Sequence, residues 1–299
     1  MILTFLSISF FFSLVDTREK RKYNGNDSIL GVDCLKQRII FGALAVVVTV
    51  ALFVICVETR VLFLAVCAVL GGREMAMAIR KCGYNPRLWP VFALCAASAS
   101  LMYFGLDKLV VPAFVLVLIA LFVQTVLTGH PPVRDVFSTM AVCAYPVTPI
   151  LLCVRVALNP VLWAPVFLNA LASAILSDTF ALFGGMRFGR HKLCPAISPN
   201  KTVEGLACGL AAGTLSAFPV HWVLRLFGLG VIPLWGELVC ALLASLAGAL
   251  GDLAASCVKR EAKIKDYSHL IPGHGGILDR VDSAIFAIPV VYMVYAILV

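Results

Sequence analysis

Residues 232–255, IPLWGELVCALLASLAGALGDLAA, form an almost continuous apolar run. A helix that crosses a bilayer needs about 20 mostly apolar residues. The run is continuous and does not alternate between apolar and polar residues, which favours a helix over a barrel strand. A helix also satisfies its own backbone polar groups in lipid. Residues 232–255 therefore predict one membrane-spanning helix.

The whole chain has the same apolar character. Of its 299 residues, 61% are hydrophobic and 13% are charged, and its mean hydropathy is +0.99. Soluble globular proteins carry roughly 45–50% apolar and about 25% charged residues. Most of the 11 cysteines lie inside apolar runs, where cysteine behaves as a small hydrophobic residue, so a disulfide framework is excluded. We predict an all-α, polytopic integral membrane protein.

Nine apolar runs are long enough to be helical spans. They are Arg38–Val57, Arg60–Ile79, Leu88–Gly105, Leu109–Thr128, Asp135–Leu158, Pro160–Phe183, Val203–Phe227, Ile232–Ala255 and Val281–Val299. With the amino terminus in the cytoplasm, 19 of the 24 Lys and Arg residues fall in cytoplasmic segments, four fall outside and one lies within a span. This asymmetry agrees with the positive-inside rule. The net charge of +8 therefore needs no nucleic-acid partner to explain it.

The chain divides into a tail and a membrane domain. Residues 1–34 have a short apolar stretch followed by a basic cluster, which is the reverse of a secretory signal. We treat 1–34 as an amino-terminal tail, with a membrane-surface segment, a misassigned start and a tenth span as open alternatives. Residues 35–299 form the predicted transmembrane catalytic domain, and its polar site lies within 174–283.

Acidic residues gather near two long predicted cytoplasmic connections, 186–202 and 256–280. Seven of the 16 lie in or beside them, namely Asp178, Glu204, Asp252, Glu261, Asp266, Asp279 and Asp282. Asp178 interrupts an apolar run, and a carboxylate at such a depth usually faces a cavity or a partner. Any chemistry is therefore expected at the cytoplasmic end of the carboxyl-terminal half, although a helix-to-helix polar contact would also explain Asp178.

The end of the eighth span places three polar side chains on one helical face. Asp252, Ser256 and Lys259 follow the i, i+4, i+7 spacing. Asp279 and Asp282 likewise share one side at the start of the last span, after a glycine-rich turn. Glycines let backbone amides approach an anion, and carboxylate oxygens suit Mg²⁺. Each acid alone would also be explained by the helix dipole.

Two further polar positions are less decisive. Lys201 lies beside small polar residues at a predicted helix start, within a basic loop that anionic lipids could also explain. Glu74 can pair with Arg73 or Arg80, and this pairing would be purely structural.

The polar segment at 256–283 resembles the signature of bacterial phosphatidate cytidylyltransferases, the CDP-diacylglycerol synthases. It reads Ser256-x-x-Lys259-Arg260-x-x-x-x-Lys265-Asp266-x-x-x-x-x-Pro272-Gly273-His274-Gly275-Gly276-x-x-Asp279-Arg280-x-Asp282-Ser283. Residues 177–179 and 198–205 are similar to other polar segments of that family. The resemblance runs from about Leu35 to the carboxyl terminus. The chain departs from the family pattern at Ala255, where many members carry an acid, and at Asn200, where a second Lys is common.

The resemblance implies transfer of CMP from CTP to phosphatidic acid, in the bacterial inner membrane with the active site facing the cytoplasm. It also implies one or two Mg²⁺ ions, contact with membrane lipid and a homodimer. The implied catalytic residues are Asp178, Asp252, Asp279, Asp282 and Lys259, of which Asp252 and Asp279 hold metal. The implied substrate-binding residues are Lys201, Ser256, Arg260, His274, Gly275, Gly276 and Arg280.

Two other functions compete with this one. A transporter would use Asp178 and Asp252 as ion or proton sites, although the acids gather at one face of one half of the chain. A CDP-alcohol phosphotransferase would need a closely spaced acidic pattern that the sequence lacks.

Overall fold

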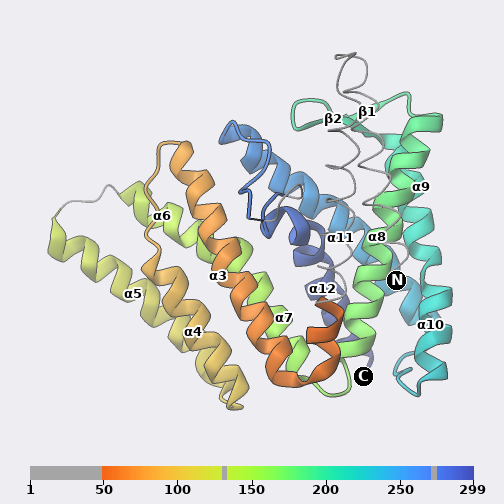
Figure 1. Cartoon of the computed structure of the whole chain (residues 1–299), viewed down its shortest axis with the longest axis horizontal. Helices are drawn as coiled ribbons and strands as arrows, with labels where there is room; N and C mark the ends of the chain where they lie inside the picture. Colours follow the sequence, from red (N-terminus) through yellow and green to blue (C-terminus); the bar gives the residue numbers. More distant parts are fainter. Residues whose placement is uncertain (1–48, 130–132, 271–274) are drawn as a thin grey trace, which may run out of the picture.

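The computed structural model describes residues 49–129, 133–270 and 275–299 (Figure 1). Its elements, in chain order, are α3 (Val57–Lys81), α4 (Trp89–Tyr103), η1 (Asp107–Leu109), α5 (Val110–Thr128), α6 (Val133–Val142), η2 (Cys143–Val147), α7 (Thr148–Leu158), α8 (Trp163–Phe188), β1 (Lys192–Cys194), β2 (Ser198–Thr202), α9 (Val203–Leu215), α10 (Ala217–Leu226), α11 (Leu234–Glu261) and α12 (Leu278–Leu298). The antiparallel pair β1–β2 is the one sheet in the described part of the chain.

The helices confirm the all-α, polytopic membrane class. Within the described residues, seven helical segments are long and apolar enough to cross a bilayer, and α4 is shorter, at 15 residues. These eight segments coincide with the last eight expected spans. The first expected span, Arg38–Val57, falls mainly outside the described residues, as does the tail 1–34. The count of nine and the orientation stay predictions.

Two of the expected spans are present but are not single continuous helices. The span 135–158 breaks at Tyr145, whose φ of −143° and ψ of 122° are extended. The cause is Pro146, which lacks an N–H group and keeps the preceding residue out of the helical region. The span 203–227 divides at Ser216 into α9 and α10. There the Ser216 hydroxyl donates to the Gly213 carbonyl at 2.6 Å, and Pro219 removes a helical hydrogen bond.

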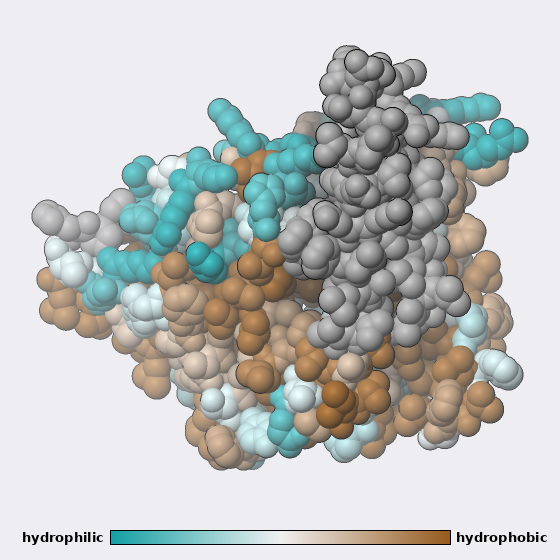
Figure 2. All heavy atoms as spheres, viewed as in Figure 1, coloured by the Kyte–Doolittle hydropathy of each residue, from teal (hydrophilic) through white to brown (hydrophobic). Residues whose placement is uncertain are grey.

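Successive spans run in opposite directions, so the connections α3–α4, α8–α9 and α11–α12 all emerge at the same end of the bundle, uppermost in Figure 1. Hydrophilic residues gather at that end in Figure 2, above a broad hydrophobic belt. The segments that carry the expected site residues therefore meet at one polar end of the molecule.

Small residues bring α8, α9, α11 and α12 close together below that end. A Cβ atom added to Gly209 of α9 would lie 2.6 Å from the Ser177 carbonyl oxygen of α8, and one added to Gly251 of α11 would lie 2.5 Å from the Asp282 carbonyl oxygen of α12. Such close backbone approach is typical of helix packing in membranes. The close packing places Asp282 directly beside the segment that carries Asp252.

Candidate active site

An ion pair joins α11 to the start of α9. Lys201 Nζ lies 2.5 Å from Asp252 Oδ2, and the two side chains are 29% and 31% exposed. Lys201 is held there because Thr202 caps α9, with its hydroxyl oxygen accepting a hydrogen bond from the Gly205 amide at 3.1 Å. The expected position of Lys201 at a helix start is confirmed, and the structure adds its partner.

A second and more buried ion pair joins α11 to α12. Lys259 Nζ lies 3.0 Å from Asp279 Oδ1, with side chains 15% and 4% exposed. The other oxygen, Asp279 Oδ2, accepts hydrogen bonds from the amides of Tyr267 at 2.9 Å and Gly276 at 3.0 Å. Both oxygens of Asp279 are therefore engaged by the protein itself. A metal ion at Asp279 would have to displace some of these donors.

Three carboxylates from three helices lie within electrostatic reach of one another. Asp178 of α8 interacts with Asp252 of α11, and Asp282 of α12 interacts with both. Asp282 Oδ1 also accepts a hydrogen bond from the Ser283 amide at 2.8 Å. Among the described residues, neither Asp178 nor Asp282 has a Lys or Arg within ion-pair distance. Lys201 acts on Asp178 and Lys259 acts on Asp282 from further away, so three formal negative charges face two lysines, one of which is paired with Asp279.

The carboxylate cluster could supply part of the ligands of a divalent cation but not a complete protein cage. Across residues 49–129, 133–270 and 275–299, no group of three or more His, Cys, Asp or Glu side chains is close enough to enclose a metal ion. Mg²⁺ is usually held by one or two carboxylates together with water and substrate phosphates. The excess negative charge of Asp178, Asp252 and Asp282 suits a cation of that kind.

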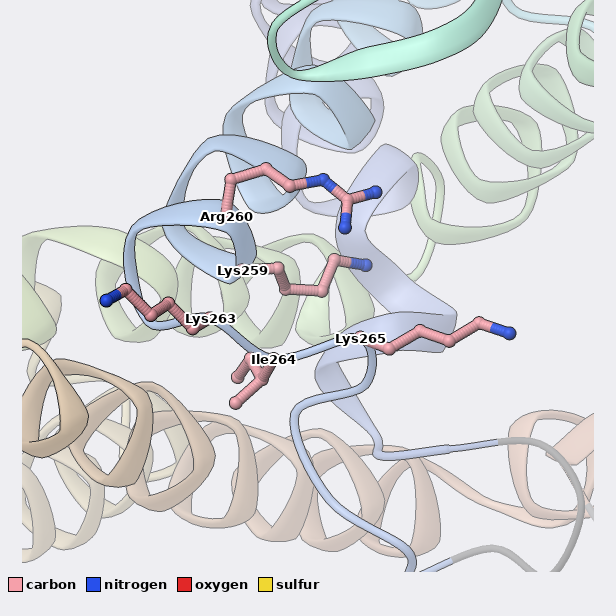
Figure 3. A pocket seen from close by; sticks show the side chains of 5 residues that line it. All are labelled: Lys259, Arg260, Lys263, Ile264 and Lys265. Carbon is pink, nitrogen blue, oxygen red and sulfur yellow. The ribbon is translucent and has the colours of Figure 1, made fainter.

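A basic pocket of about 460 Å³ adjoins the carboxylates at the end of α11 (Figure 3). Figure 3 shows the tips of Lys259, Arg260 and Lys265 pointing the same way, whereas Lys263 points in the opposite direction. Arg260 Nε donates to the carbonyl oxygen of Ile197, in the β1–β2 turn, at 3.0 Å. Lys263 and Ile264 complete the lining. The pocket can bind an anion beside the carboxylate cluster.

In the glycine-rich turn, one backbone amide already has an acceptor, because the Gly276 amide donates to Asp279. The binding of a phosphate by the amides around Gly275 and Gly276 stays a prediction. Gly275 has a φ of +81°, which a residue with a side chain adopts at a cost. His274 lies outside the described residues.

The remaining expected residues differ in exposure. Ser256 is half-buried between Asp252 and Lys259 on the same face of α11, whereas Arg280 is exposed.

The sequence matches the model of a known protein family. The model of the cytidylyltransferase family matches residues 36–298, which is most of the chain. This protein belongs to the cytidylyltransferase family.

Shorter alignments connect this cytidylyltransferase-family protein with curated relatives. It is 46% identical over 114 residues to a phosphatidate cytidylyltransferase of Staphylococcus saprophyticus, covering 38% of this chain and 42% of that protein. It is 43% identical over 120 residues to one of Bacillus subtilis, covering 40% and 43%. One of Staphylococcus aureus is 44% identical over 114 residues, covering 38% and 42%. The alignments span less than half the length of these relatives.

Sequence reasoning missed the role of Glu74 in this family member. Glu74 is 5% exposed, and its Oε1 accepts from the Ser268 hydroxyl at 2.6 Å and the Ile277 amide at 3.1 Å. Its Oε2 accepts from the Leu278 amide at 2.8 Å. The expected pairing with Arg73 or Arg80 is not what the described contacts show, because Arg80 instead donates to a backbone carbonyl. No local sequence signal links Glu74 to residues about 200 positions away.

Tyr145 was also missed, although the Tyr-Pro pair inside an apolar run was a signal. Its hydroxyl is buried without a hydrogen-bond partner among the described residues. Its ring packs edge-on against Phe286, one turn after Asp282, with centroids 5.6 Å apart. The hydroxyl also interacts electrostatically with Asp252 and Asp282. The break in the helix thus brings a polar group to the carboxylate cluster.

Tyr267 closes the site against α11. Burial raises the pKa of its phenol above the ordinary range, so the hydroxyl stays protonated. It donates to the carbonyl oxygen of Ala255 at 2.9 Å. Ala255, one of the two positions at which the sequence departs from the pattern that it resembles, is fully buried here.

Proposed function

We propose that this chain is a phosphatidate cytidylyltransferase, which converts CTP and phosphatidic acid into CDP-diacylglycerol and pyrophosphate. An oxygen of the phosphatidic acid phosphate forms a bond to the α-phosphorus of CTP. The bond from that phosphorus to the oxygen that bridges to the β-phosphorus breaks, and pyrophosphate leaves with its electron pair. Family membership and the names of the curated relatives support this reaction.

The observation that carries the proposal is the meeting of Asp178, Asp252 and Asp282 beside a lysine-rich pocket, at one polar end of a membrane bundle. The reaction brings two anions together, so its main requirement is charge neutralisation. The attacking phosphate is already anionic and needs no general base. A site made of carboxylates for a cation and lysines for phosphates meets that requirement.

Asp252 and Asp282, with Asp178 in support, are the carboxylates that we propose would hold Mg²⁺, as one ion or as a pair. Bound Mg²⁺ would neutralise phosphate oxygens and make the α-phosphorus more electrophilic. Asp279, named with Asp252 as a metal ligand from the sequence, would keep this role only if it exchanged a backbone amide or Lys259 for the ion.

The cations have separate places in this proposal. Lys201, paired with Asp252, would contact the α-phosphate near the metal. Lys259, Arg260 and Lys265 would hold the β- and γ-phosphates and then the pyrophosphate. Ser256 and Arg280 would contact the substrate from α11 and α12, and His274 is retained as a substrate-binding residue on the resemblance alone.

The membrane location follows from the lipid substrate. The acyl chains of phosphatidic acid would stay in the bilayer beside the hydrophobic belt, while the headgroup meets CTP at the polar end. We propose the bacterial inner membrane with that end in the cytoplasm, where the predicted positive-inside asymmetry puts it. A homodimer stays an expectation of the family resemblance.

Purified protein in lipid nanodiscs tests the reaction directly. Incubation with CTP labelled at the α-phosphate, phosphatidic acid and Mg²⁺ should move the label into the lipid phase, and EDTA should stop the transfer. Asp252→Asn and Asp282→Asn should each lower turnover by at least about 10²-fold. Glu261→Gln, at an exposed position at the end of α11, provides a matched loss of negative charge outside the cluster.

Two outcomes would contradict the proposal. Unlabelled lipid with fully folded protein would exclude the reaction, and substrate movement across sealed vesicles without CTP consumption would favour a transporter instead. Near-normal turnover by both Asp252→Asn and Asp282→Asn would exclude the proposed metal ligands while leaving the reaction intact.

A further inference from the structure

The start of α12 has an unusual source of capping. Its own N-cap residue, Ile277, makes no side-chain capping hydrogen bond. The first amides of a helix need acceptors, and a negative group is stabilised there by the helix dipole. In this chain the acceptor is Glu74, which comes from α3, about 200 residues earlier. The cap therefore links two distant parts of the sequence.

The Glu74 carboxylate lies at the amino-terminal end of α12, which is the kind of position at which a helix can bind an anion. A Cβ atom added to Gly276 would lie 2.6 Å from both Glu74 oxygens. Glycine at 276 leaves room for this carboxylate, and a larger residue there would push the Glu74 side chain away from its present place. Ser268, near the middle of the connection between α11 and α12, donates its hydroxyl to Glu74 as well. One carboxylate therefore ties the middle of the α11–α12 connection to the start of α12.

The same connection positions the acids of the site. Asp279 binds the Tyr267 and Gly276 amides, and these neighbour the Glu74 contacts at Ser268 and Ile277. Asp282 lies one turn further along α12, facing the segment of Asp252. A shift of the first turn of α12 would change the orientation of both acids. Misplacement of reacting groups by about 1 Å can cost 10²-fold in rate.

We propose that Glu74 is a positioning residue. It fixes the start of α12 from α3, so that Asp279 engages Lys259 and Asp282 faces Asp252, and it does not itself touch substrate. The inference rests on the proposed cytidylyltransferase reaction for its catalytic consequence, whereas its structural part is independent of any substrate.

The first test is hydrogen exchange of the protein without substrate or metal. In Glu74→Gln an NH₂ group replaces one of the two carboxylate oxygens. One of the backbone amides that donate to Glu74 then faces another donor and has no acceptor. The amides of Ile277 and Leu278 should then exchange at least about tenfold faster than in the unchanged protein. Glu74→Asp keeps the charge but shortens the side chain, so it should give a smaller increase.

The matched control is Glu237→Gln. Glu237 is also a fully buried glutamate, but it lies at the other end of α11, where Asn169 and the Tyr295 hydroxyl donate to it. It is 22 residues from Lys259, or roughly 33 Å along a helix. Glu237→Gln should leave exchange at Ile277 and Leu278 unchanged. Its kcat should stay within about twofold, because its contacts do not reach the site.

The catalytic readout separates positioning from folding. Glu74→Gln should lower kcat at least about tenfold while the KM for CTP changes less than about twofold, since the basic pocket is intact. Gly276→Ala should also lower kcat, because the added methyl group pushes against the Glu74 carboxylate at the start of α12. Combining Gly276→Ala with Glu74→Asp should restore part of the activity, because the shorter acid leaves room for the methyl group.

Unchanged exchange at 277–278 in folded Glu74→Gln would overturn the proposal. So would a lower midpoint of thermal unfolding with an unchanged kcat, because that pattern describes a purely structural residue. If Glu74→Gln does not fold, the double variant decides. The proposal is then overturned if the effects of Gly276→Ala and Glu74→Asp on kcat are strictly additive. Failure of the unchanged protein to make CDP-diacylglycerol would count against the proposed function, while the exchange result would still decide the role of Glu74.

Discussion

Helices α5 and α11 are both apolar enough to cross a bilayer, yet they are used in different ways. In α5, Leu121 alone is fully buried, and the other side chains are exposed or half-buried. The helix lies at one edge of the bundle (Figure 1). In α11, ten residues are buried. They are Gly236, Glu237, Cys240, Ala241, Ala244, Ser245, Ala247, Gly248, Gly251 and Ala255.

The difference lies in side-chain size and polarity. The buried face of α11 consists mostly of glycine, alanine and serine, which let neighbouring backbones approach closely. α5 presents large apolar side chains such as Leu116 and Ile119 to its surroundings. In lipid, apolarity alone gives no reason for two helices to pack together. Small residues therefore decide which helices enclose the polar site, and large ones decide which face the bilayer.

The largest expected effect comes from enlarging a small residue of α11. Gly251→Ala would place its Cβ atom 2.5 Å from the Asp282 carbonyl oxygen and 3.0 Å from the Phe286 ring, so α12 must move. We expect a loss of about 1–3 kcal/mol in stability and a fall in kcat of about 10²-fold, because Asp282 moves with α12. Thermal unfolding and CDP-diacylglycerol synthesis in nanodiscs measure the two effects.

The control for Gly251→Ala enlarges a small residue of α5. Ala120 is exposed, so Ala120→Leu should change stability by no more than about 0.5 kcal/mol and leave kcat unchanged. Similar losses in both variants would contradict the difference between the two helices, since they would show that α5 is packed as tightly as α11.

An intermediate effect is expected from Tyr145, which reaches the site from the half of the chain that contains α5. Tyr145→Phe removes a buried hydroxyl with no partner among the described residues, so stability should be unchanged or slightly higher. If the hydroxyl donates to a substrate phosphate, kcat should fall about tenfold. Steady-state kinetics with Tyr292→Phe as the control measures this. An unchanged kcat would show that the Tyr145 hydroxyl takes no part in the reaction and that the reacting groups come from the part of the chain between α8 and α12.

The sequence predicted the parts of this molecule that depend on local pattern. Apolar runs gave the spans, because a helix in lipid needs only its own residues to be satisfied. The one-face spacing of Asp252 and Lys259, and the position of Lys201 at a helix start, followed from helical periodicity. The breaks at Tyr145 and Ser216 were overlooked, although Pro146 and Pro219 were visible within the runs.

The partners of the site residues could not be predicted in the same way. The contacts of Glu74 with Ile277 and Leu278 bridge more than 200 residues, and they depend on how α3 and α12 pack. Asp279 illustrates the same limit. The resemblance implies that it holds metal, and this stays a prediction, whereas its contacts with Lys259 and two backbone amides are visible only in the structure. Spacing identifies which side chains share a face but not which of them are already satisfied.

The smallest expected effect concerns two lysines at the end of α11, beyond the tightly packed face. Lys265 points with Lys259 and Arg260, whereas Lys263 points away from them (Figure 3). Lys265→Gln should raise the KM for CTP about three- to fivefold at low salt and less at high salt, because an exposed cation acts through a screened interaction. Lys263→Gln, with the same loss of charge two residues away, should change KM less than about twofold. Equal effects would mean that the end of α11 attracts CTP only through its total charge, and the directed arrangement of the pocket would then have no role in binding.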